Sequence, residues 1–229
     1  MQLFYFQNPK DEFTLSVEES NHIIKVLRKK QGDTLFFTDG KGYEYIVKIS
    51  SINKKSCSVV IIDKKKQDKK HSGRLHIAIA PTKNTSRFEW FLEKSTEIGI
   101  DEITPIICSN SERKFINYDR CNKIIISAMK QSLKHYLPKL NDIITFKKFT
   151  EKSIQGAKYI AHCHERKKLT FHKLKRSDIT TILIGPEGDF SKEEIELAEN
   201  KDIKSITLGK TRLRTETAGI TSVLINNII

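Results

Sequence analysis

The sequence predicts an α/β domain on a largely parallel sheet, preceded by a small β-barrel. From about residue 74 onward, apolar strands alternate with amphipathic helices, which is the pattern of a parallel sheet. Before residue 63, short strands are separated by turn residues and interrupted by one helix, as in small barrels. The charged segment 63–70 has no apolar residue. We therefore expect domains at 1–70 and 71–229; the alternative is that this segment is a long solvated hairpin tip.

The barrel prediction depends on three strands and one helix. Residues 33–38 are β-branched and aromatic, 39–42 form a glycine-containing turn, and 43–49 return as the paired strand. A third strand is expected at 56–62. Ser16 can cap a helix that runs toward Val26, and Glu19 has the spacing of a capping box.

The second domain begins with a continuous apolar strand at 75–80, as expected for a strand buried on both faces. A helix follows at 86–98, with Phe88, Phe91, Leu92 and Ser95 on one face, and Gly99 ends it. Further strands are predicted at 102–108, 159–162, 182–184 and 205–208. Further helices are predicted at 119–133, after the capping box Ser191–Glu194, and at 216–228.

The chain is strongly basic. Its 229 residues contain 41 Lys and Arg against 28 Asp and Glu, for a formal net charge of +13. This excess favours a polyanionic partner such as a nucleic acid, because lysine and arginine displace the counterions condensed on phosphates. A lysine-rich proteome would also produce such a charge, so charge alone does not decide between the two.

Other bulk features exclude several classes of protein. No apolar run approaches the roughly 20 residues that span a bilayer, and the first residues lack the features of a signal peptide. The four cysteines form no C-x-x-C pair, which suggests reduced thiols in a cytoplasmic protein. His162–Glu165 contains metal-ligating residue types, but neighbours on a strand point to opposite faces. We therefore expect a cytoplasmic protein with no membrane partner and no metal site.

Four loops follow predicted strands or begin helices, and these should meet at one edge of the sheet. They are 81–87, 162–166, 185–191 and 209–217. Ligands of open parallel sheets bind at the carboxyl ends of the strands. The loops therefore predict a ligand pocket.

The loop Gly185–Gly188 matches neither a Walker A nor a G-x-G-x-x-G motif, so the sequence does not indicate phosphate binding there. Two glycines beside a proline give a tight turn whose backbone a ligand can approach. Such a turn could recognise the edge of an adenine through backbone amides and carbonyls. The alternative is a strand-to-helix turn selected for its geometry alone.

The second loop carries two arginines. In an extended loop, Arg212 and Arg214 lie on one side and Leu213 on the other. One guanidinium could hold a phosphate and the other could act on a base. Glu216 begins the last helix, where a carboxylate suits the helix dipole; a functional role is the alternative.

Taken together, these motifs resemble one family. Ile184–Gly188 with Phe190 and Ser191, Leu208–Gly209, and Leu213–Ala218 resemble segments of the RsmE-type small-subunit ribosomal RNA uridine-N3 methyltransferases. Further similarities lie upstream, at Lys83, Arg87, Glu93, Lys94, Glu97, Gly99, Gln131, Ser132, Pro138, His22, 26–28 and 32–33. Asp189 departs from the pattern, because a second glycine is common there, and Lys210 lies where the loop is often uncharged.

The resemblance implies a PUA-like RNA-binding barrel followed by a SPOUT domain with a trefoil knot. It implies S-adenosyl-L-methionine as cofactor, 16S ribosomal RNA or the small ribosomal subunit as substrate, and a homodimer. The implied cofactor-binding residues are Ala161, His162, Ile184, Gly185, Pro186, Gly188, Leu208, Gly209, Leu213, Thr215 and Ala218. The implied RNA-binding residues are His22, Lys25, Arg28, Lys83, Arg87 and Arg212.

On this resemblance Arg214 and Glu216 are the expected catalytic residues. Uridine N3 becomes a good nucleophile only after it loses its proton, and a guanidinium favours the resulting anion. Arg214 is expected in that role, with Glu216 or a water as the proton acceptor. Two alternatives are a SPOUT enzyme acting on transfer RNA or a ribose hydroxyl, and a ribosome-associated assembly protein without turnover.

Overall fold

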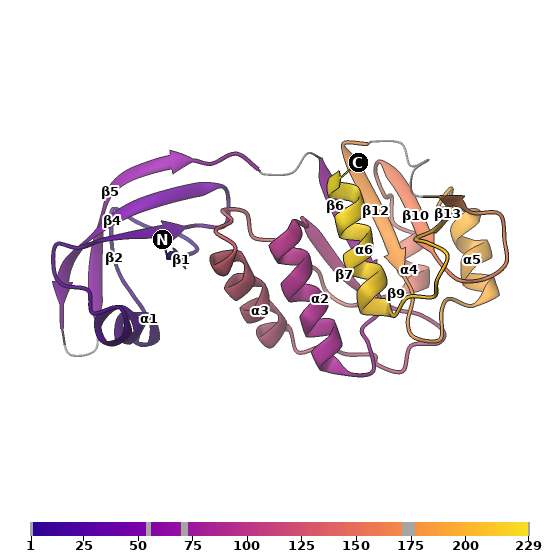
Figure 1. Ribbon diagram of the computed structural model, residues 1–229, viewed down its shortest axis with the longest axis horizontal. Coiled ribbons are helices and arrows are strands. Elements are labelled where there is room, and N and C mark those ends of the chain that lie inside the picture. Colours follow the sequence, from indigo (N-terminus) through magenta and orange to yellow (C-terminus); the bar gives the residue numbers. More distant parts are fainter. Residues whose placement is uncertain (1, 54–55, 70–72, 171–176, 229) are drawn as a thin grey trace. The chain divides into compact units, whose positions relative to one another are not determined.

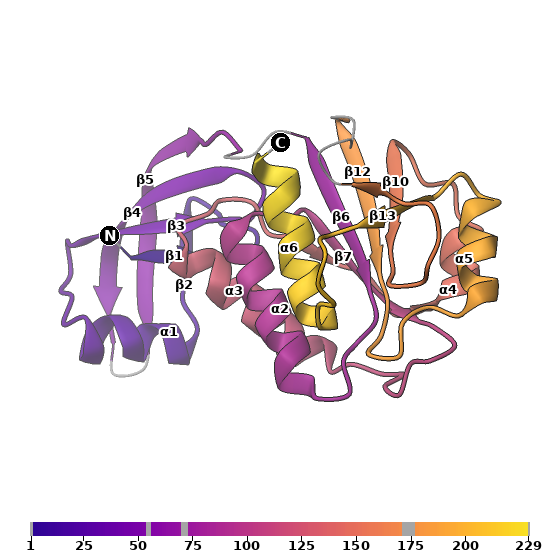
Figure 2. The same ribbon diagram turned by 45° about the vertical axis from the view of Figure 1, so that its right-hand side comes forward.

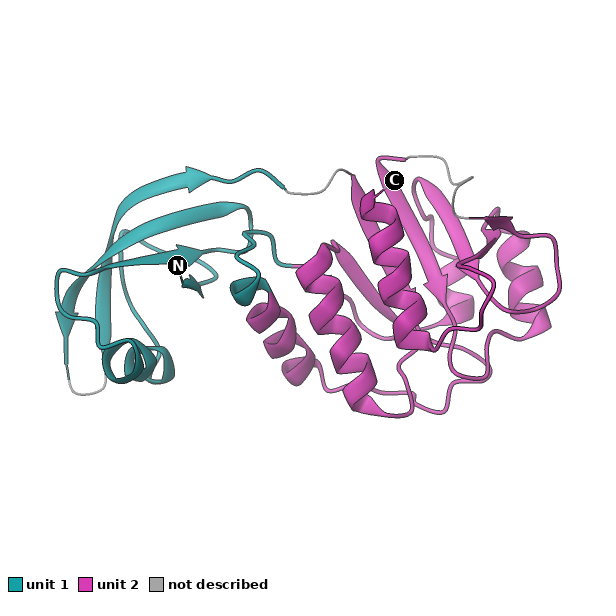
Figure 3. Cartoon of the chain, viewed as in Figure 1, with its two compact units in different colours: residues 1–69, 129–137 teal, residues 70–128, 138–229 magenta. Residues whose placement is uncertain are grey.

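The computed structural model describes residues 2–53, 56–69, 73–170 and 177–228. The chain divides into two compact units, residues 1–69 with 129–137 and residues 70–128 with 138–229 (Figure 3). The predicted boundary between residues 70 and 71 lies outside the described residues. Within the described part of the chain, no helix has the length and apolarity needed to cross a bilayer.

The first unit is built on a five-stranded sheet (Figure 1). In sheet order the strands are β1 (Leu3–Tyr5), β3 (Thr34–Thr38), β4 (Tyr43–Ile52), β5 (Cys57–Lys66) and β2 (Glu12–Thr14). The β1–β3 pair is parallel and the others are antiparallel. Register shifts at Ile46/Val47 and Ile49/Ser51 interrupt the long β4–β5 ladder, and such bulges bend a strand.

The core of this unit follows from the period-two pattern of the strands. Alternate residues of β4, namely Tyr45, Val47 and Ile49, are all buried. Buried residues from the other strands and the helical segment complete the core: Phe4, Phe13, Leu15, Ile23, Leu35, Phe37, Cys57 and Val59. The predicted strands at 33–38, 43–49 and 56–62 are therefore confirmed.

Two expectations for this unit need correction. The charged segment 63–70 is not wholly a linker, since β5 continues through Lys66 and pairs with Tyr43–Ile46. The Nζ of Lys64 lies 4.2 Å from the centre of the Tyr43 ring, so this lysine packs on an aromatic face.

The second correction concerns residues 129–137, which were predicted within the second domain but belong to the first unit. Two backbone hydrogen bonds hold them there: Gly42 N donates to His135 O (2.8 Å), and Leu137 N donates to Gly40 O (2.9 Å).

The predicted helix after Ser16 is present in two parts. The helix α1 (Val17–Asn21) begins where Ser16 Oγ accepts from Glu19 N at 3.2 Å, as expected of a cap. It continues as the π-helical turn η1 (His22–Val26). Arg28, just beyond, has a φ of 53°.

The second unit contains an eight-stranded sheet in which every pair is parallel, which confirms the predicted sheet. In sheet order the strands are β11 (Leu169–Thr170), β13 (Lys204–Thr207), β10 (Ala157–Ala161), β12 (Ile179–Ile184), β6 (Arg74–Ile79), β7 (Glu102–Ile107) and β8 (Lys139–Leu140), with β9 (Ile144–Thr145) beside β7. The two-residue strands β8, β9 and β11 were not predicted, because so short a segment has no measurable periodicity.

Helices cover both faces of this sheet (Figures 1 and 2). On one face α2 (Thr85–Ile98) packs beside α6 (Thr215–Ile228). The predicted face of α2 is confirmed, since Phe88, Phe91, Leu92 and Ser95 are all buried. The chain then continues through α3 (Tyr118–Gln131).

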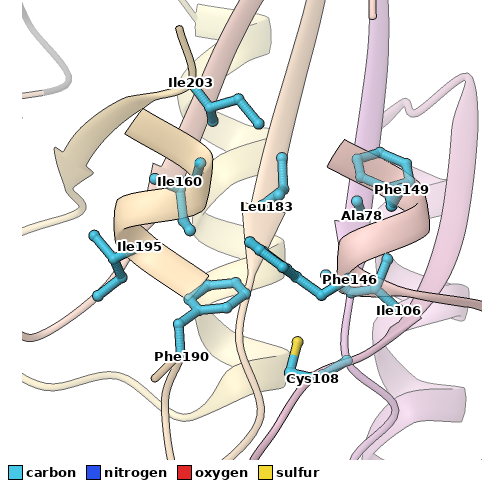
Figure 4. Close-up of a cluster of buried hydrophobic side chains, with 12 residues drawn as sticks. Ala78, Ile106, Cys108, Phe146, Phe149, Ile160, Leu183, Phe190, Ile195 and Ile203 are labelled. Atoms are coloured by element: carbon cyan, nitrogen blue, oxygen red, sulfur yellow. The ribbon is translucent and has the colours of Figure 1, made fainter. Parts of the chain in front are cut away.

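On the other face lie α4 (Phe146–Thr150) and α5 (Lys192–Glu199), over the cluster shown in Figure 4. Ser191 and Glu194 form the predicted capping box of α5. The five-residue α4 was not predicted; it contributes Phe146 and Phe149 to the core. The cluster consists of Ala78, Ala80, Ile106, Cys108, Phe146, Phe149, Ile160, Leu183, Phe190, Ile195, Ala198 and Ile203.

Gly219 sets the close approach of α6 to α2. A Cβ at this position would lie 2.6 Å from the Phe91 ring and 3.0 Å from the Ile79 side chain. We expect Gly219→Val to lower the free energy of unfolding by about 1–3 kcal/mol, because the added side chain overpacks the buried contact with Phe91 and Ile79. Leu224→Val places the same β-branched residue at a 42% exposed site of the helix and should cost about 0.5 kcal/mol or less. Urea denaturation measures both, and equal losses would contradict this packing.

Candidate functional site

A cavity of about 540 Å³ lies at the carboxyl ends of β10, β12 and β13. This volume is within the range of small-molecule sites. Its lining comes from the loops that follow these three strands, all within the second unit. The lining residues are Ala161, His162, Cys163, Lys168, Ile184, Gly185, Pro186, Glu187, Asp189, Thr207, Leu208, Gly209, Lys210, Thr211, Arg212, Leu213, Arg214, Thr215 and Ala218.

The loop after β12 is anchored in the core by Phe190, which is 1% exposed. A Cβ on Gly185 would approach the Phe190 ring to 3.0 Å and the Phe190 nitrogen to 3.2 Å. Gly185 is therefore needed for the geometry of the strand-to-helix turn, which is the alternative to a binding role given in the sequence analysis. Gly185 and Pro186 also line the cavity, so recognition of an adenine edge by the backbone of this loop stays a prediction.

Asp189 ties two of the loops together. Its φ is +63°, a conformation that glycine adopts freely and aspartate tolerates. Its carboxylate accepts from the backbone N–H of Cys163 (2.7 Å) and from that of Phe190 (2.8 Å). The side chain of Asp189 therefore links the loops that follow β10 and β12.

A second link joins the β12 loop to the segment after β13. The buried hydroxyl of Thr215 donates to the carbonyl of Gly185 at 3.0 Å. Arg212 Nη2 donates to the carbonyl of Glu187 at 3.4 Å. Side-chain hydrogen bonds to backbone carbonyls therefore fix the β12 loop against the segment that follows β13.

His162 is a neutral, hydrogen-bonded wall of the cavity. It is 6% exposed, and its Nε2 lies 3.0 Å from Ser205 Oγ. Ser205 in turn donates to Glu199 Oε1 at 2.9 Å, so its hydroxyl proton is used and His162 Nε2 is the N–H donor. Burial, together with the positive charge of Lys168, lowers the pKa of His162 to about 4.

Positive charge predominates on the cavity wall. The cations are Lys168, Lys210, Arg212 and Arg214, and the carboxylates are Glu187 and Asp189. Both carboxylates have backbone partners, since Glu187 Oε1 accepts from Lys83 N at 3.0 Å. The cavity can therefore hold an apolar or backbone-recognised ligand beside an anion.

The structure brings most of the predicted cofactor residues to this cavity. Ala161, His162, Ile184, Gly185, Pro186, Leu208, Gly209, Leu213, Thr215 and Ala218 all line it, as does Arg212, which was assigned to RNA. Gly188 does not; a Cβ there would meet Asn110 at 3.0 Å, and Asn110 donates to its carbonyl at 3.1 Å.

Only one of the two predicted catalytic residues lines the cavity. Arg214 is exposed and lines the cavity, whereas Glu216 is buried and does not. Glu216 Oε1 lies 3.8 Å from Arg87 Nε, and its Oε2 has no hydrogen-bond partner among the described residues.

Lys83, one of the predicted RNA-binding residues of the second unit, forms an ion pair with Glu112, with its Nζ 2.7 Å from Glu112 Oε2.

The predicted RNA-binding residues of the first unit lie on one short segment. His22 and Lys25 belong to η1, and Arg28 follows it. His22 Nε2 is 2.8 Å from Gln2 Nε2. The structure places these three residues together on one segment but does not test whether they bind RNA, so that role stays a prediction.

Some lining residues were not named individually as binding residues. Cys163, Glu187, Asp189, Lys210 and Thr211 lie within the predicted loops, whereas Lys168 and Thr207 lie outside them. All except Lys168 adjoin or lie between residues predicted to bind the cofactor or RNA, so they could have been identified from their positions in the sequence. Lys168 was not signalled; it reaches the site because its Nζ donates to His162 O at 3.0 Å.

Comparisons with known proteins agree with this geometry. Residues 68–226 match the model of the RNA methyltransferase domain family, and residues 15–62 match that of the RNA methyltransferase PUA domain. Ribosomal RNA small subunit methyltransferase E of Rickettsia conorii is 33% identical over 223 residues, 95% of this chain and 89% of the relative. The chain belongs to the RsmE-type family of RNA methyltransferases.

Two solved structures extend the similarity of this RsmE-type chain to three dimensions. One, described as a probable rRNA-methyltransferase of Porphyromonas gingivalis, has a TM-score of 0.93 at 39% identity and covers 97% of this chain and 95% of its own. The other is ribosomal RNA small subunit methyltransferase E of Neisseria gonorrhoeae bound to S-adenosyl methionine, with a TM-score of 0.83, 25% identity and coverage of 97% and 95%. The predicted PUA-like and SPOUT-type domains are thus confirmed, while the trefoil knot stays a prediction.

The depressed pKa of His162 makes stability depend on pH. Between its folded value of about 4 and its ordinary value of 6.5, the unfolded chain binds more protons, so the free energy of unfolding falls as pH falls through this window. His162→Gln keeps an amide donor for Ser205 but does not titrate. We expect its free energy of unfolding to fall less than that of the wild type between pH 6.5 and 4, by urea denaturation. If the free energy of unfolding depends on pH in the same way for both proteins, His162 does not contribute to the pH dependence of stability.

Proposed function

We propose that this chain transfers the methyl group of S-adenosyl-L-methionine to N3 of a uridine in 16S ribosomal RNA. The observation that carries the proposal is the 540 Å³ cavity, formed by three strand-end loops within the RNA methyltransferase domain. Relatives named ribosomal RNA small subunit methyltransferase E support the reaction and its substrate.

The residues present fit this cofactor. Gly209, with a φ of +154°, faces open space: a Cβ built there has no atom within 4 Å. Ile184, Leu208 and Leu213 offer apolar contacts for an adenine ring, and loop amides and carbonyls can pair with its edge. When bound, S-adenosylmethionine supplies a methyl group already activated by its sulfonium, so the protein needs mainly to align the reactants.

Arg214 is the residue we assign to the uridine. It is exposed at the cavity, where a guanidinium can favour the anion left when N3 loses its proton. Arg212 is partly engaged with the Glu187 carbonyl and is suited to hold a neighbouring phosphate.

Of the two proton acceptors considered, a water in the cavity fits the geometry of the single chain better. A general base must reach its proton directly or through one water. Glu216 is buried in the first turn of α6, beside Arg87, and does not line the cavity. We therefore propose that Glu216 orients Arg87 and supports the N-terminus of α6, whose dipole favours a carboxylate.

We further propose that the enzyme acts as a homodimer on the small ribosomal subunit or its RNA, in the cytoplasm where that RNA is assembled. The PUA domain, with His22, Lys25 and Arg28, would provide further RNA contacts. In the second unit, Lys83, Arg87 and Arg212 are the proposed contacts. Trp90 on α2, which is 42% exposed, provides apolar surface for the second copy.

Arg214→Ala tests the assignment of the reaction. We expect kcat for N3-methyluridine formation to fall about 10²–10³-fold, because a charge stabiliser of the transition state is lost. The measurement is nucleoside mass spectrometry of ribosomal RNA lacking the modification, after incubation with the cofactor.

Two controls make this test specific. Calorimetry with S-adenosylmethionine should give the same affinity for Arg214→Ala as for the wild type. Arg120→Ala removes a surface arginine that pairs with Glu89, outside the cavity, and should leave the rate unchanged. Wild-type turnover by Arg214→Ala with normal cofactor binding would contradict the role of Arg214.

A further inference from the structure

A second cavity, of about 720 Å³, lies at the opposite end of the same sheet. Its lining includes the first residues of β6, β7, β8 and β12, which are Arg74, Glu102, Lys139 and Ile179. The methyl-donor cavity is at the carboxyl ends of the strands, so the two cavities share no lining residue. The reaction proposed above makes no use of this second one.

The floor of this cavity is the polar half of one sheet face. His76 pairs in register with Glu102 and with Thr181, so their side chains share a face with Ala78 and Leu183 two residues further along. Toward the carboxyl ends that face is apolar and covered by α4 and α5, as Figure 4 shows for Ala78, Leu183 and Phe149. The polar half is buried only in part: Thr104 and Thr181 are buried, whereas His76, beside the Phe149 ring of α4, is half-buried and lines the cavity.

Hydrogen bonds fix these floor residues in place. His76 Nε2 lies 2.7 Å from Thr104 Oγ1, and Asn141 Nδ2 donates to Thr104 Oγ1 (2.8 Å) and to Glu102 Oε1 (2.7 Å). Arg74 pairs with Glu102. A preorganised set of donors and acceptors at the floor of a cavity is suited to the edge of a polar ring such as a nucleobase.

Lysines surround the floor. Lys139, Lys148 and Lys152 line the cavity, and all three are exposed. Among the described residues, no carboxylate lies within 4 Å of their ammonium groups. Two carboxylates also line the cavity: Glu102, which is held by Arg74 and Asn141, and Asp142, which is exposed. The three exposed lysines outnumber the exposed Asp142, so the charge at the rim favours an anion.

We propose that this cavity binds a nucleotide of the RNA substrate at a distance from the methylated base. The phosphates lie among Lys139, Lys148 and Lys152, and the base lies over the floor of His76 and Asn141. The volume exceeds that needed for a phosphate alone and suits a nucleotide. The proposal rests on the proposed function, because it takes RNA as the substrate.

The test compares two triple variants of the whole chain. The first changes Lys139, Lys148 and Lys152 to Gln. The matched control changes Lys147, Lys201 and Lys204 to Gln; these are equally exposed lysines of the same unit, and Lys147 neighbours Lys148 on α4 but does not line the cavity. Binding of a fluorescein-labelled oligouridylate is measured by anisotropy over a range of salt concentrations.

Each phosphate contact to a single strand contributes about 0.7 to the slope of log K against log salt. For the cavity variant, we expect the slope of log K against log salt to become less steep by about 1–2, and the affinity for RNA at low salt to fall at least about tenfold. The control variant should show neither change. Calorimetry should show unchanged S-adenosylmethionine binding by both variants.

Equal slopes and affinities for the two variants, or no RNA binding by the wild type, would overturn the proposal. Methyl transfer by the wild type is assayed in parallel on ribosomal RNA. Transfer with equal slopes would refute only the second site. Absence of transfer, with the slope difference present, would refute only the proposed reaction.

Discussion

The hydrogen bond from Thr215 to the carbonyl of Gly185 is the interaction on which the methyl-donor site depends. It joins the loop after β12 to the start of α6, two segments 30 residues apart in the chain. With Asp189, which accepts from Cys163 and Phe190, it fixes three strand-end loops around one cavity. The ligand is therefore met largely by backbone already held in position, which reduces the cost of ordering the site on binding.

The sheet explains why one small domain can have two sites. Strand polarity separates the polar groups of its face into two sets, with an apolar cluster under α4 and α5 between them. At the carboxyl ends, glycine turns allow a ligand to approach the backbone. At the amino ends, His76, Thr104 and Asn141 form a fixed polar floor beneath lysines. The two sites can change independently, because their residues do not touch the same loops.

Periodicity predicted the elements that bury a full face, such as α2 with Phe88 and Phe91, and the parallel sheet with its apolar strands. It could not predict β8, β9 or α4, which are too short to have a period and form only through tertiary contacts. The same limit applies to the site. The position of Asp189 in the glycine loop was visible, but its bond to Cys163 requires β10 and β12 to be neighbours.

Calorimetry of S-adenosylmethionine binding to Thr215→Val and Thr215→Ser tests the central claim directly. Valine leaves the buried Gly185 carbonyl without its donor, a loss of about 1–3 kcal/mol, whereas serine keeps the hydroxyl. The account predicts one site per chain in the wild type, near-normal affinity for Thr215→Ser, and affinity about tenfold or more weaker for Thr215→Val. Equal affinity in all three proteins, or no binding by the wild type, would contradict it.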